Sequence, residues 1–305
     1  MPLRVFGLAA ILLAAVAVSS CSDADAQATA PQAARVDGSP YVLQGTQVWT
    51  VPDPVSGRDY EVFVSLPASY TASPDRRYPV LYVTDADYAF PIIRQIARRV
   101  NLNEPMVEEF ILVGLSYSRG DSPIASRNRD YTPTANGPRS AGSMIHGGGR
   151  AYQTYLKTEA IPFIEEHFRA DPTRRVLLGH SYGGLLGAQI MFTDPGLFRA
   201  YVLGSPSFWF DRRHIMTMEA DYARTHRDLP ADVFMYIGAW EVPGVDSRNA
   251  PIDMVGDMRT MERVLTSRAY PGLRVRSTVL EDEDHLTVAP VGFTRALLAV
   301  LPARP

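Results

Sequence analysis

Cysteine and lysine are almost absent from this chain of 305 residues. Cys21 is the only cysteine and Lys157 the only lysine. A single thiol excludes an internal disulfide framework and a zinc cluster built on thiolates. With so little lysine, the cations are arginines, whose guanidinium groups can bind anions through two hydrogen bonds. The net charge of −3 gives no general attraction to anionic lipid or nucleic acid, so no nucleic-acid partner is expected.

The N-terminus has the pattern of a secretory signal peptide, predicted for residues 1–20. A basic residue, Arg4, precedes an apolar run from Val5 to Val18, which is too short for a comfortable membrane span. Val18-Ser19-Ser20-Cys21 resembles the lipobox of bacterial lipoproteins, in which the cysteine becomes the lipidated first residue of the mature protein. The alternative is an ordinary cleaved signal followed by a chance cysteine.

These features predict a bacterial periplasmic protein that is anchored to a membrane by acyl chains on Cys21. Ser22, directly after the cysteine, slightly favours the outer membrane. Residues 21–40 are rich in Ala, Gln, Asp and Pro and are expected to be a disordered tether. Residues 41–305 are expected to form a single domain, because no repeat or linker follows the tether and the composition supports one large core. The oligomeric state is left open.

Short apolar runs alternate with amphipathic segments throughout the predicted domain. Strands are expected at 46–51, 60–66, 78–84, 109–114, 176–178, 200–204, 233–238 and 274–280, the first two antiparallel. Helices are expected at 88–101, 152–168, 184–192, 212–227, 252–267 and 288–301. This alternation predicts a doubly wound, mostly parallel α/β sheet with helices on both faces and a site at the carboxyl ends of the strands. A loop over 117–149 is long enough to be functional.

The sequence Gly179-His180-Ser181-Tyr182-Gly183 lies between a predicted buried strand and a predicted helix and fits G-x-S-x-G. A serine at such a tight turn projects its hydroxyl above the sheet, and the flanking glycines let strand and helix approach each other. We therefore interpret Ser181 as a nucleophile. The amide of Tyr182 is at the helix N-terminus, where it can donate to a developing oxyanion.

A second oxyanion donor is expected directly after the third strand. Asp85-Ala86-Asp87 occupies that place, so the amide of Ala86 or Asp87 is the candidate. No histidine or further carboxylate cluster accompanies the two aspartates, and no metal site is expected there.

A serine nucleophile needs an imidazole to accept its proton and an acid to orient that imidazole. In this type of fold the acid and then the histidine follow the serine along the chain. His285 follows the last strand, as this order requires, and His146 is its only serious rival. Glu241 follows the strand VFMYIG and is the predicted acid. The remaining candidates are Asp246, Asp282, Glu283 and Asp284.

Several stretches resemble the esterase D / ferric-enterochelin-esterase type of α/β-hydrolases. They are YPVLYVTDADYAF, RNRDYTPT, GGGRAYQTYLKTEAIPFIEEHFRADPTRRVLLGHSYGG, DPGLFRAYVLGSPSFWFD and IGAWE, which run from Tyr78 to Glu241. The resemblance implies an α/β-hydrolase fold, no cofactor, and hydrolysis of carboxylic esters through an acyl-enzyme. Two positions depart from the family: Ala86 and Leu286 stand where it usually has glycine.

Within that group the chain is similar to esterases that open the trilactone of enterobactin-like siderophores. An anionic or iron-siderophore ester is therefore one expected substrate. Arg127 and Arg129, with Arg119 and Arg139 nearby, could clamp its anionic groups; alternatively, Arg127 and Asp130 form a local ion pair. Trp209 is expected to line the substrate pocket. The competing functions are an acyltransferase of the same architecture and a non-catalytic binding lipoprotein.

Overall fold

The computed structural model describes residues 38, 40–138, 144–245 and 251–303. The predicted signal peptide, Cys21 and nearly all of the predicted tether lie outside the described residues, as do Arg139 and Asp246. The chain divides by its internal contacts into two units, Met1–Val42 and Leu43–Pro305, and the second contains every described helix and strand. None of the described helices is both long and apolar enough to cross a membrane.

An eight-stranded sheet forms the centre of the second unit. Its order is β1 (Thr46–Asp53), β2 (Arg58–Ser65), β4 (Ile111–Ser118), β3 (Tyr78–Thr84), β5 (Ala170–His180), β6 (Ala200–Gly204), β7 (Asp232–Gly238) and β8 (Arg274–Leu280). Pairing is antiparallel between β1 and β2 and between β2 and β4, and parallel from β4 to β8. The prediction of a mostly parallel sheet with antiparallel opening strands is confirmed.

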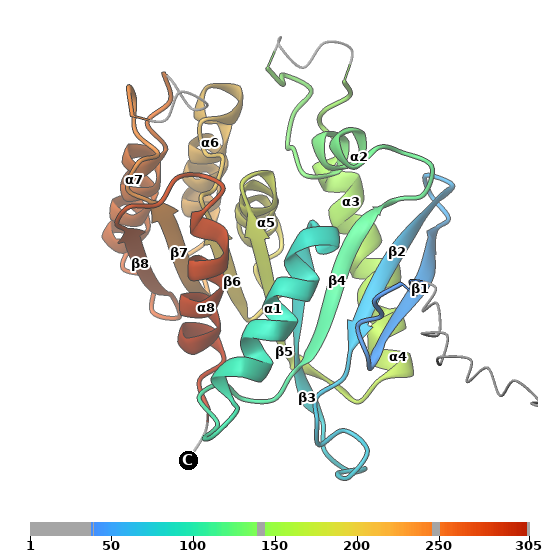
Figure 1. The fold of residues 1–305 in the computed structure, drawn as a ribbon. Helices are drawn as coiled ribbons and strands as arrows, with labels where there is room; N and C mark the ends of the chain where they lie inside the picture. Colours follow the sequence, from blue (N-terminus) through green and yellow to red (C-terminus); the bar gives the residue numbers. More distant parts are fainter. Residues whose placement is uncertain (1–37, 39, 139–143, 246–250, 304–305) are drawn as a thin grey trace, which may run out of the picture. The chain divides into compact units, whose positions relative to one another are not determined.

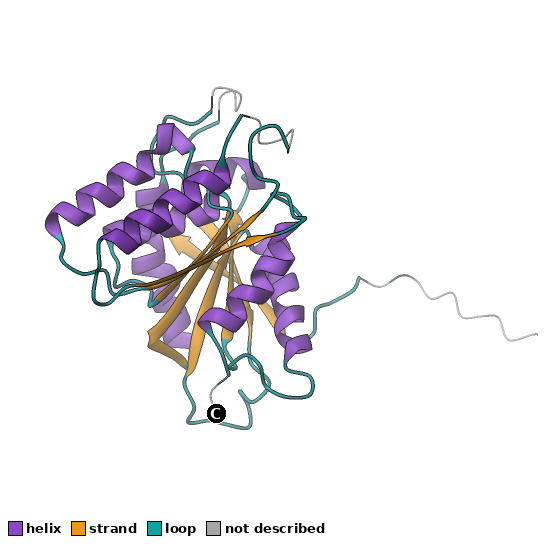
Figure 2. Ribbon diagram, turned by 90° about the vertical axis from the view of Figure 1, so that its left-hand side faces the viewer, coloured by secondary structure: helices purple, strands orange, loops and turns teal. Residues whose placement is uncertain are grey.

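Helices cover both faces of this sheet. Helices α1 (Ala86–Val100) and α8 (Val288–Val300) lie on one face, and α5 (Tyr182–Thr193), α6 (Phe210–Thr225) and α7 (Met254–Ser267) lie on the other (Figure 1). Figure 2 shows the strands between the two helical layers. Because both faces are covered, all seven residues of β3 are buried, as expected for a central parallel strand. The arrangement is the predicted doubly wound α/β-hydrolase fold.

The helix predicted for residues 152–168 begins earlier and is not uniform. It consists of α3 (Gly149–Tyr155), a π-helical turn (Leu156–Ala160) and α4 (Ile161–His167). Pro162 lies in the first turn of α4. Proline has no N–H to donate and its ring clashes with the carbonyl four residues earlier. The wider π-helical turn accommodates this residue without ending the helix.

The prediction of a continuous loop over 117–149 is wrong. Strand β4 continues to Ser118, and an additional helix, α2 (Pro123–Asp130), follows it. The Ser122 side chain accepts a hydrogen bond from the Ala125 amide and caps this helix, and proline is favourable in a first turn. The residues that α2 buries are Ser126, Asn128 and Asp130. Helix α2 therefore lacks the apolar stripe by which helices are predicted.

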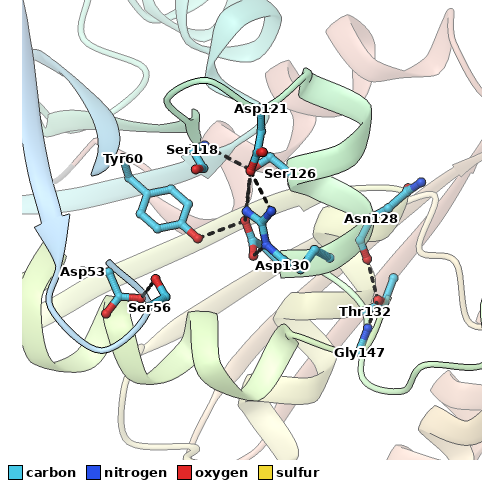
Figure 3. Close-up of polar contacts among 11 residues, drawn as sticks. Asp53, Ser56, Tyr60, Ser118, Asp121, Ser126, Asn128, Asp130, Thr132 and Gly147 are labelled. Carbon is cyan, nitrogen blue, oxygen red and sulfur yellow. Dashed lines mark hydrogen bonds and ion pairs between the residues drawn. The ribbon is translucent and has the colours of Figure 1, made fainter. Parts of the chain in front are cut away.

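A buried polar cluster replaces the missing apolar contacts of α2 (Figure 3). Asp130 accepts hydrogen bonds from the Tyr60 hydroxyl at 3.1 Å and from the Ser126 hydroxyl at 3.0 Å. Arg129 donates through Nε and Nη2 to Asp130 and through Nη1 to Asp121. Burial and Asp130 raise the pKa of Tyr60, which therefore remains a donor. The cluster joins α2 to β2 and to the end of β4.

The buried pair of Arg129 and Asp130 should be important for stability. Asp130→Ala leaves the guanidinium without its bidentate partner, which should lower the free energy of unfolding by about 3 to 5 kcal/mol. Urea denaturation followed by circular dichroism measures this loss. Asp75→Ala, in an exposed loop, is the matched control and should change stability by less than about 0.5 kcal/mol. Equal stability of the two variants would contradict a structural role for the cluster.

Candidate active site

The carboxyl ends of the parallel strands bring distant parts of the sequence together. Strand β5 pairs with β3 and β6, β6 pairs with β7, and β7 pairs with β8. The residues that directly follow β3, β5, β6 and β7 therefore lie along one edge of the sheet, and so do those after β8. They include Asp85, Ser181, Ser205, Glu241 and His285. The site is at the edge predicted from the strand pattern.

Ser181 occupies a sharp turn between β5 and α5. Its backbone has φ 60° and ψ −118°, a conformation that non-glycine residues rarely adopt. Its amide donates to the Gly204 carbonyl at 2.8 Å, which ties the turn to β6. A Cβ atom on Gly179 would lie 2.2 Å from the Gly183 backbone, and one on Gly183 would lie 2.2 Å from Thr84 Oγ1. The glycines are thus required by close packing, as the motif predicted.

Glu241 and His285 form a direct hydrogen-bonded pair. Glu241 Oε2 lies 2.6 Å from His285 Nδ1, and the carboxylate is completely buried. Its other oxygen accepts from the Gly238 amide at 2.9 Å and from the Ser205 hydroxyl at 2.6 Å. A carboxylate only accepts here, so His285 Nδ1 carries the proton and Nε2 is left as the basic nitrogen. The structure brings the predicted acid and base together.

The other acid candidates have different surroundings. Asp284 accepts hydrogen bonds from the Leu286 and Thr287 amides just before α8. Asp282 occupies a turn with φ 60°, and Asp246 lies outside the described residues. The direct hydrogen bond to His285 Nδ1 comes from Glu241.

His146, the rival base, packs elsewhere. Its ring lies 5.9 Å from that of Phe210, and Nδ1 lies 3.2 Å from the Met144 carbonyl oxygen. This histidine is buried in the segment between α2 and α3. The geometry therefore favours His285 as the base.

The predicted oxyanion donors lie at two neighbouring helix N-termini. Tyr182 is the first residue of α5, and Ala86 and Asp87 are the first two residues of α1. Amides at these positions have no acceptor within their own helix, and the helix dipole favours negative charge there. The contact between Thr84 and Gly183 places the two helix starts side by side. Helix α1 begins at Ala86, two residues before the start predicted at Tyr88, and Asp85 immediately before it adopts a left-handed conformation.

Arg127 has a different partner from the one considered in the sequence. Its Nε and Nη2 donate to the two oxygens of Asp85 at 3.0 and 3.3 Å, while Asp130 pairs with Arg129. The Tyr117 hydroxyl also donates to Asp85. The Arg127 guanidinium lies over the Tyr182 ring, 5.3 Å from its centroid. Arg127 therefore places a positive charge beside the residue that follows Ser181.

The other predicted substrate contacts differ in kind. Trp209 is partly exposed and its ring lies 6.1 Å from that of Tyr182, which is compatible with a pocket wall. All three guanidinium nitrogens of Arg129 donate within the polar cluster. These contacts give Arg129 a structural role in holding α2.

Two serines of the site were missed in the sequence. Ser205 supports the buried acid, and Ser207 Oγ lies 3.3 Å from Ser181 Oγ. Both belong to the Ser-Pro-Ser segment that directly follows β6, and that position was the available signal. The assembled groups are a serine at a strained turn, an imidazole of fixed tautomer, helix N-termini and a guanidinium. Such a set suits acyl transfer through a serine nucleophile.

Comparisons with known proteins point to the same chemistry. A sequence family described as "Putative esterase" matches residues 54–234. Ferri-bacillibactin esterase BesA of Bacillus subtilis is 27% identical over 266 residues, or 84% of this chain and 90% of that protein. Siderophore triacetylfusarinine C esterase of Aspergillus fumigatus is 25% identical over 262 residues, or 79% and 88% of the two chains. The crystal structure of BES protein from Bacillus cereus matches with a TM-score of 0.74 and 25% identity, covering 88% of this chain and 99% of that one.

Glu241→Gln tests the acid. The amide can donate to His285 Nδ1 and so favours the wrong tautomer, which should lower kcat for p-nitrophenyl acetate by about 10²- to 10⁴-fold. Asp284→Asn is the matched control, because its side chain keeps an oxygen for the nearby amides, and its kcat should stay within about threefold. A larger loss in the control than in Glu241→Gln would transfer the acid role to the segment before His285.

Proposed function

The chain belongs to the family of putative esterases and is a carboxylic-ester hydrolase, and from this premise we propose that Ser181, His285 and Glu241 carry out the reaction. The hydrogen bond of 2.6 Å between Glu241 and His285 is the observation on which the proposal rests. It fixes the imidazole with Nε2 free to accept the proton of the serine. Ser181 belongs to the strained turn that defines this class of nucleophile.

The proposed reaction has two halves. Ser181 Oγ attacks the ester carbonyl carbon while His285 Nε2 takes its proton, and the same proton then passes to the leaving alcohol. Water then attacks the acyl carbon while His285 Nε2 takes its proton; the bond to Ser181 Oγ breaks, the proton passes from His285 to this oxygen, and the acid product leaves. In both halves negative charge develops on the carbonyl oxygen. The amides of Tyr182 and of Ala86 or Asp87 donate hydrogen bonds to that oxygen and so stabilise the charge. Asp87 also accepts a hydrogen bond from Ser116 at 2.6 Å, which holds the start of α1.

We propose a siderophore as the physiological substrate, in particular a catecholate with trilactone ester bonds. Two relatives covered along most of their length are named as esterases of siderophores. Arg127 is about one-quarter exposed and lies beside Tyr182 at the nucleophile. Its positive charge can therefore meet an anionic group of the substrate. Trp209 supplies an aromatic surface near the same residue.

Membrane attachment through Cys21 remains a proposal that rests on the lipobox-like sequence. Acylation of this cysteine would hold the hydrolase at a membrane surface in the bacterial periplasm, on the outer membrane if Ser22 acts as expected.

The proposed substrate can be tested by measuring how fast the full chain, solubilised in detergent, hydrolyses two different esters. We expect kcat/KM for an iron-loaded catecholate trilactone to exceed that for p-nitrophenyl butyrate by about 100-fold, as specific polar recognition allows. Ser181→Ala should abolish both activities and keep the melting temperature. Turnover of the simple ester alone would contradict the siderophore proposal, and retained activity of Ser181→Ala would contradict the nucleophile. Acyl transfer to an added alcohol in preference to water would indicate an acyltransferase.

Arg127→Leu is the companion variant in this comparison. Loss of a charged contact should lower kcat/KM for the trilactone by about tenfold more than for the neutral ester. Arg224→Leu is the matched control, because Arg224 lies in the last turn of α6, is 74% exposed and pairs with Asp221 of the same helix. Equal losses on both esters would mean that Arg127 serves the reaction and not the substrate anion.

The anchor can be tested with Cys21→Ser in a bacterial host. The wild-type chain should be labelled by radioactive palmitate and should sediment with membranes, because acylation supplies the apolar contact with the bilayer. Cys21→Ser should lose both properties. Membrane sedimentation of Cys21→Ser without label would show that another segment binds the membrane.

A further inference from the structure

His180, which directly precedes the nucleophile, makes close contacts with the proposed catalytic histidine. Its Nε2 lies 2.9 Å from the backbone carbonyl oxygen of His285. The two imidazole rings lie 4.8 Å apart, centroid to centroid. On the other side of the ring, Nδ1 lies 3.4 Å from the Tyr236 hydroxyl. His180 thus joins β7, β5 and the segment that follows β8.

These contacts fix the tautomer of His180. A carbonyl oxygen can only accept a hydrogen bond, so Nε2 must carry a proton. In the neutral ring Nδ1 is then an acceptor, and the Tyr236 hydroxyl donates to it. Burial raises the pKa of Tyr236, so this hydroxyl keeps its proton. The result is a directed sequence of hydrogen bonds from Tyr236 through His180 to the backbone of His285.

Tyr236 is itself held in place by two glycines. A Cβ atom on Gly204 of β6 would lie 2.2 Å from the Tyr236 hydroxyl, and one on Gly292 of α8 would lie 2.2 Å from its ring. The ring also meets that of Phe293 edge to face at 6.4 Å. The donor to His180 Nδ1 is therefore confined between a strand and a helix.

The environment of His180 also keeps its ring uncharged. Burial, then the neighbouring His285 and the positive charge of Arg127, lower the pKa of His180 to about 3, although its hydrogen bond to the His285 backbone acts in the opposite direction. A charged imidazole beside His285 would oppose the imidazolium that forms when Ser181 gives up its proton. A neutral donor avoids this repulsion.

We propose that His180 is a positioning residue that fastens the backbone of His285 to the nucleophile turn, while Glu241 orients its imidazole. The proposal rests on the catalytic roles given above to Ser181 and His285. Because His180 and Ser181 are consecutive, the hydrogen bond from His180 ties the base to the residue next to the nucleophile. Movement of one is then followed by movement of the other, and the separation of serine and imidazole is maintained.

Two substitutions of His180 separate positioning from packing. His180→Gln keeps a side-chain N–H near the place of Nε2, whereas His180→Phe keeps the ring and removes the donor. For p-nitrophenyl acetate, His180→Phe should lower kcat by about 10- to 100-fold with KM within about twofold, as misplacement of a catalytic group does. His180→Gln should recover most of this loss. His226→Gln, at an exposed position after α6, is the matched control and should retain wild-type kcat.

Three kinetic outcomes decide the proposal among variants with wild-type melting temperatures. Equal losses in His180→Gln and His180→Phe, or full activity in His180→Phe, would overturn it. The pH profile of kcat/KM between pH 5 and 9 should keep its shape in His180→Gln, because a ring with a pKa of about 3 does not titrate there. Disappearance of an ionisation from the profile would show that His180 changes charge and would also overturn it.

A spectroscopic measurement on the unmodified chain does not depend on how the variants fold. With ¹⁵N-labelled histidine, the His180 resonances should show the neutral Nε2–H tautomer at pH 5, and His180→Gln identifies them by their disappearance. A protonated ring or the Nδ1–H tautomer at pH 5 would contradict the proposal. If Ser181→Ala remains active, the proposed function fails by itself, whereas the tautomer reports on His180 alone.

Discussion

The strained backbone at Ser181 is the constraint on which the site depends. Such a conformation costs about 1–3 kcal/mol, and the surrounding structure must supply that energy. Strand β5 lies between β3 and β6, and the Gly204 carbonyl of β6 accepts a hydrogen bond from the Ser181 amide. The contact between Thr84 and Gly183 brings the start of α5 against the end of β3. The same packing that holds the serine therefore sets the two helix N-termini beside it.

The sequence predicted the parts of the site that have local signals. Ser181 is marked by glycines at fixed spacing, and Glu241 and His285 by their places after strands. The pair of Arg127 and Asp85 was not predicted, because its members come from α2 and the end of β3 and meet only in the folded chain. Helix α2 was missed because it is stabilised by buried polar groups and not by an apolar stripe. The contact of His180 with His285 was not predicted, because it depends on the distant segment after β8.

The scarcity of lysine agrees with the ion pairs of this fold, which depend on the geometry of arginine. In several pairs an arginine binds both oxygens of one carboxylate, a geometry that a lysine ammonium cannot provide. Many of these carboxylates are nearly inaccessible to solvent, where an unpaired charge would be costly. Except for Arg129 and Asp130, which are neighbours in α2, the pairs join separate elements and so fix their relative positions as well as balancing charge. They are Arg127–Asp85, Arg129–Asp130, Arg174–Glu108, Arg268–Glu219 and Arg274–Asp232.

The proposed nucleophile and the proposed base differ in their distance from the edge of the sheet. Ser181 follows an interior strand, whereas His285 follows β8, which is the last strand in the order and pairs with β7 alone. Edge strands open locally, and exchange their amide hydrogens with solvent, more readily than interior strands do. Local opening of β8 would displace His285 and so inactivate the enzyme while most of the fold remains intact. Heat would then cause a reversible loss of activity below the global melting transition.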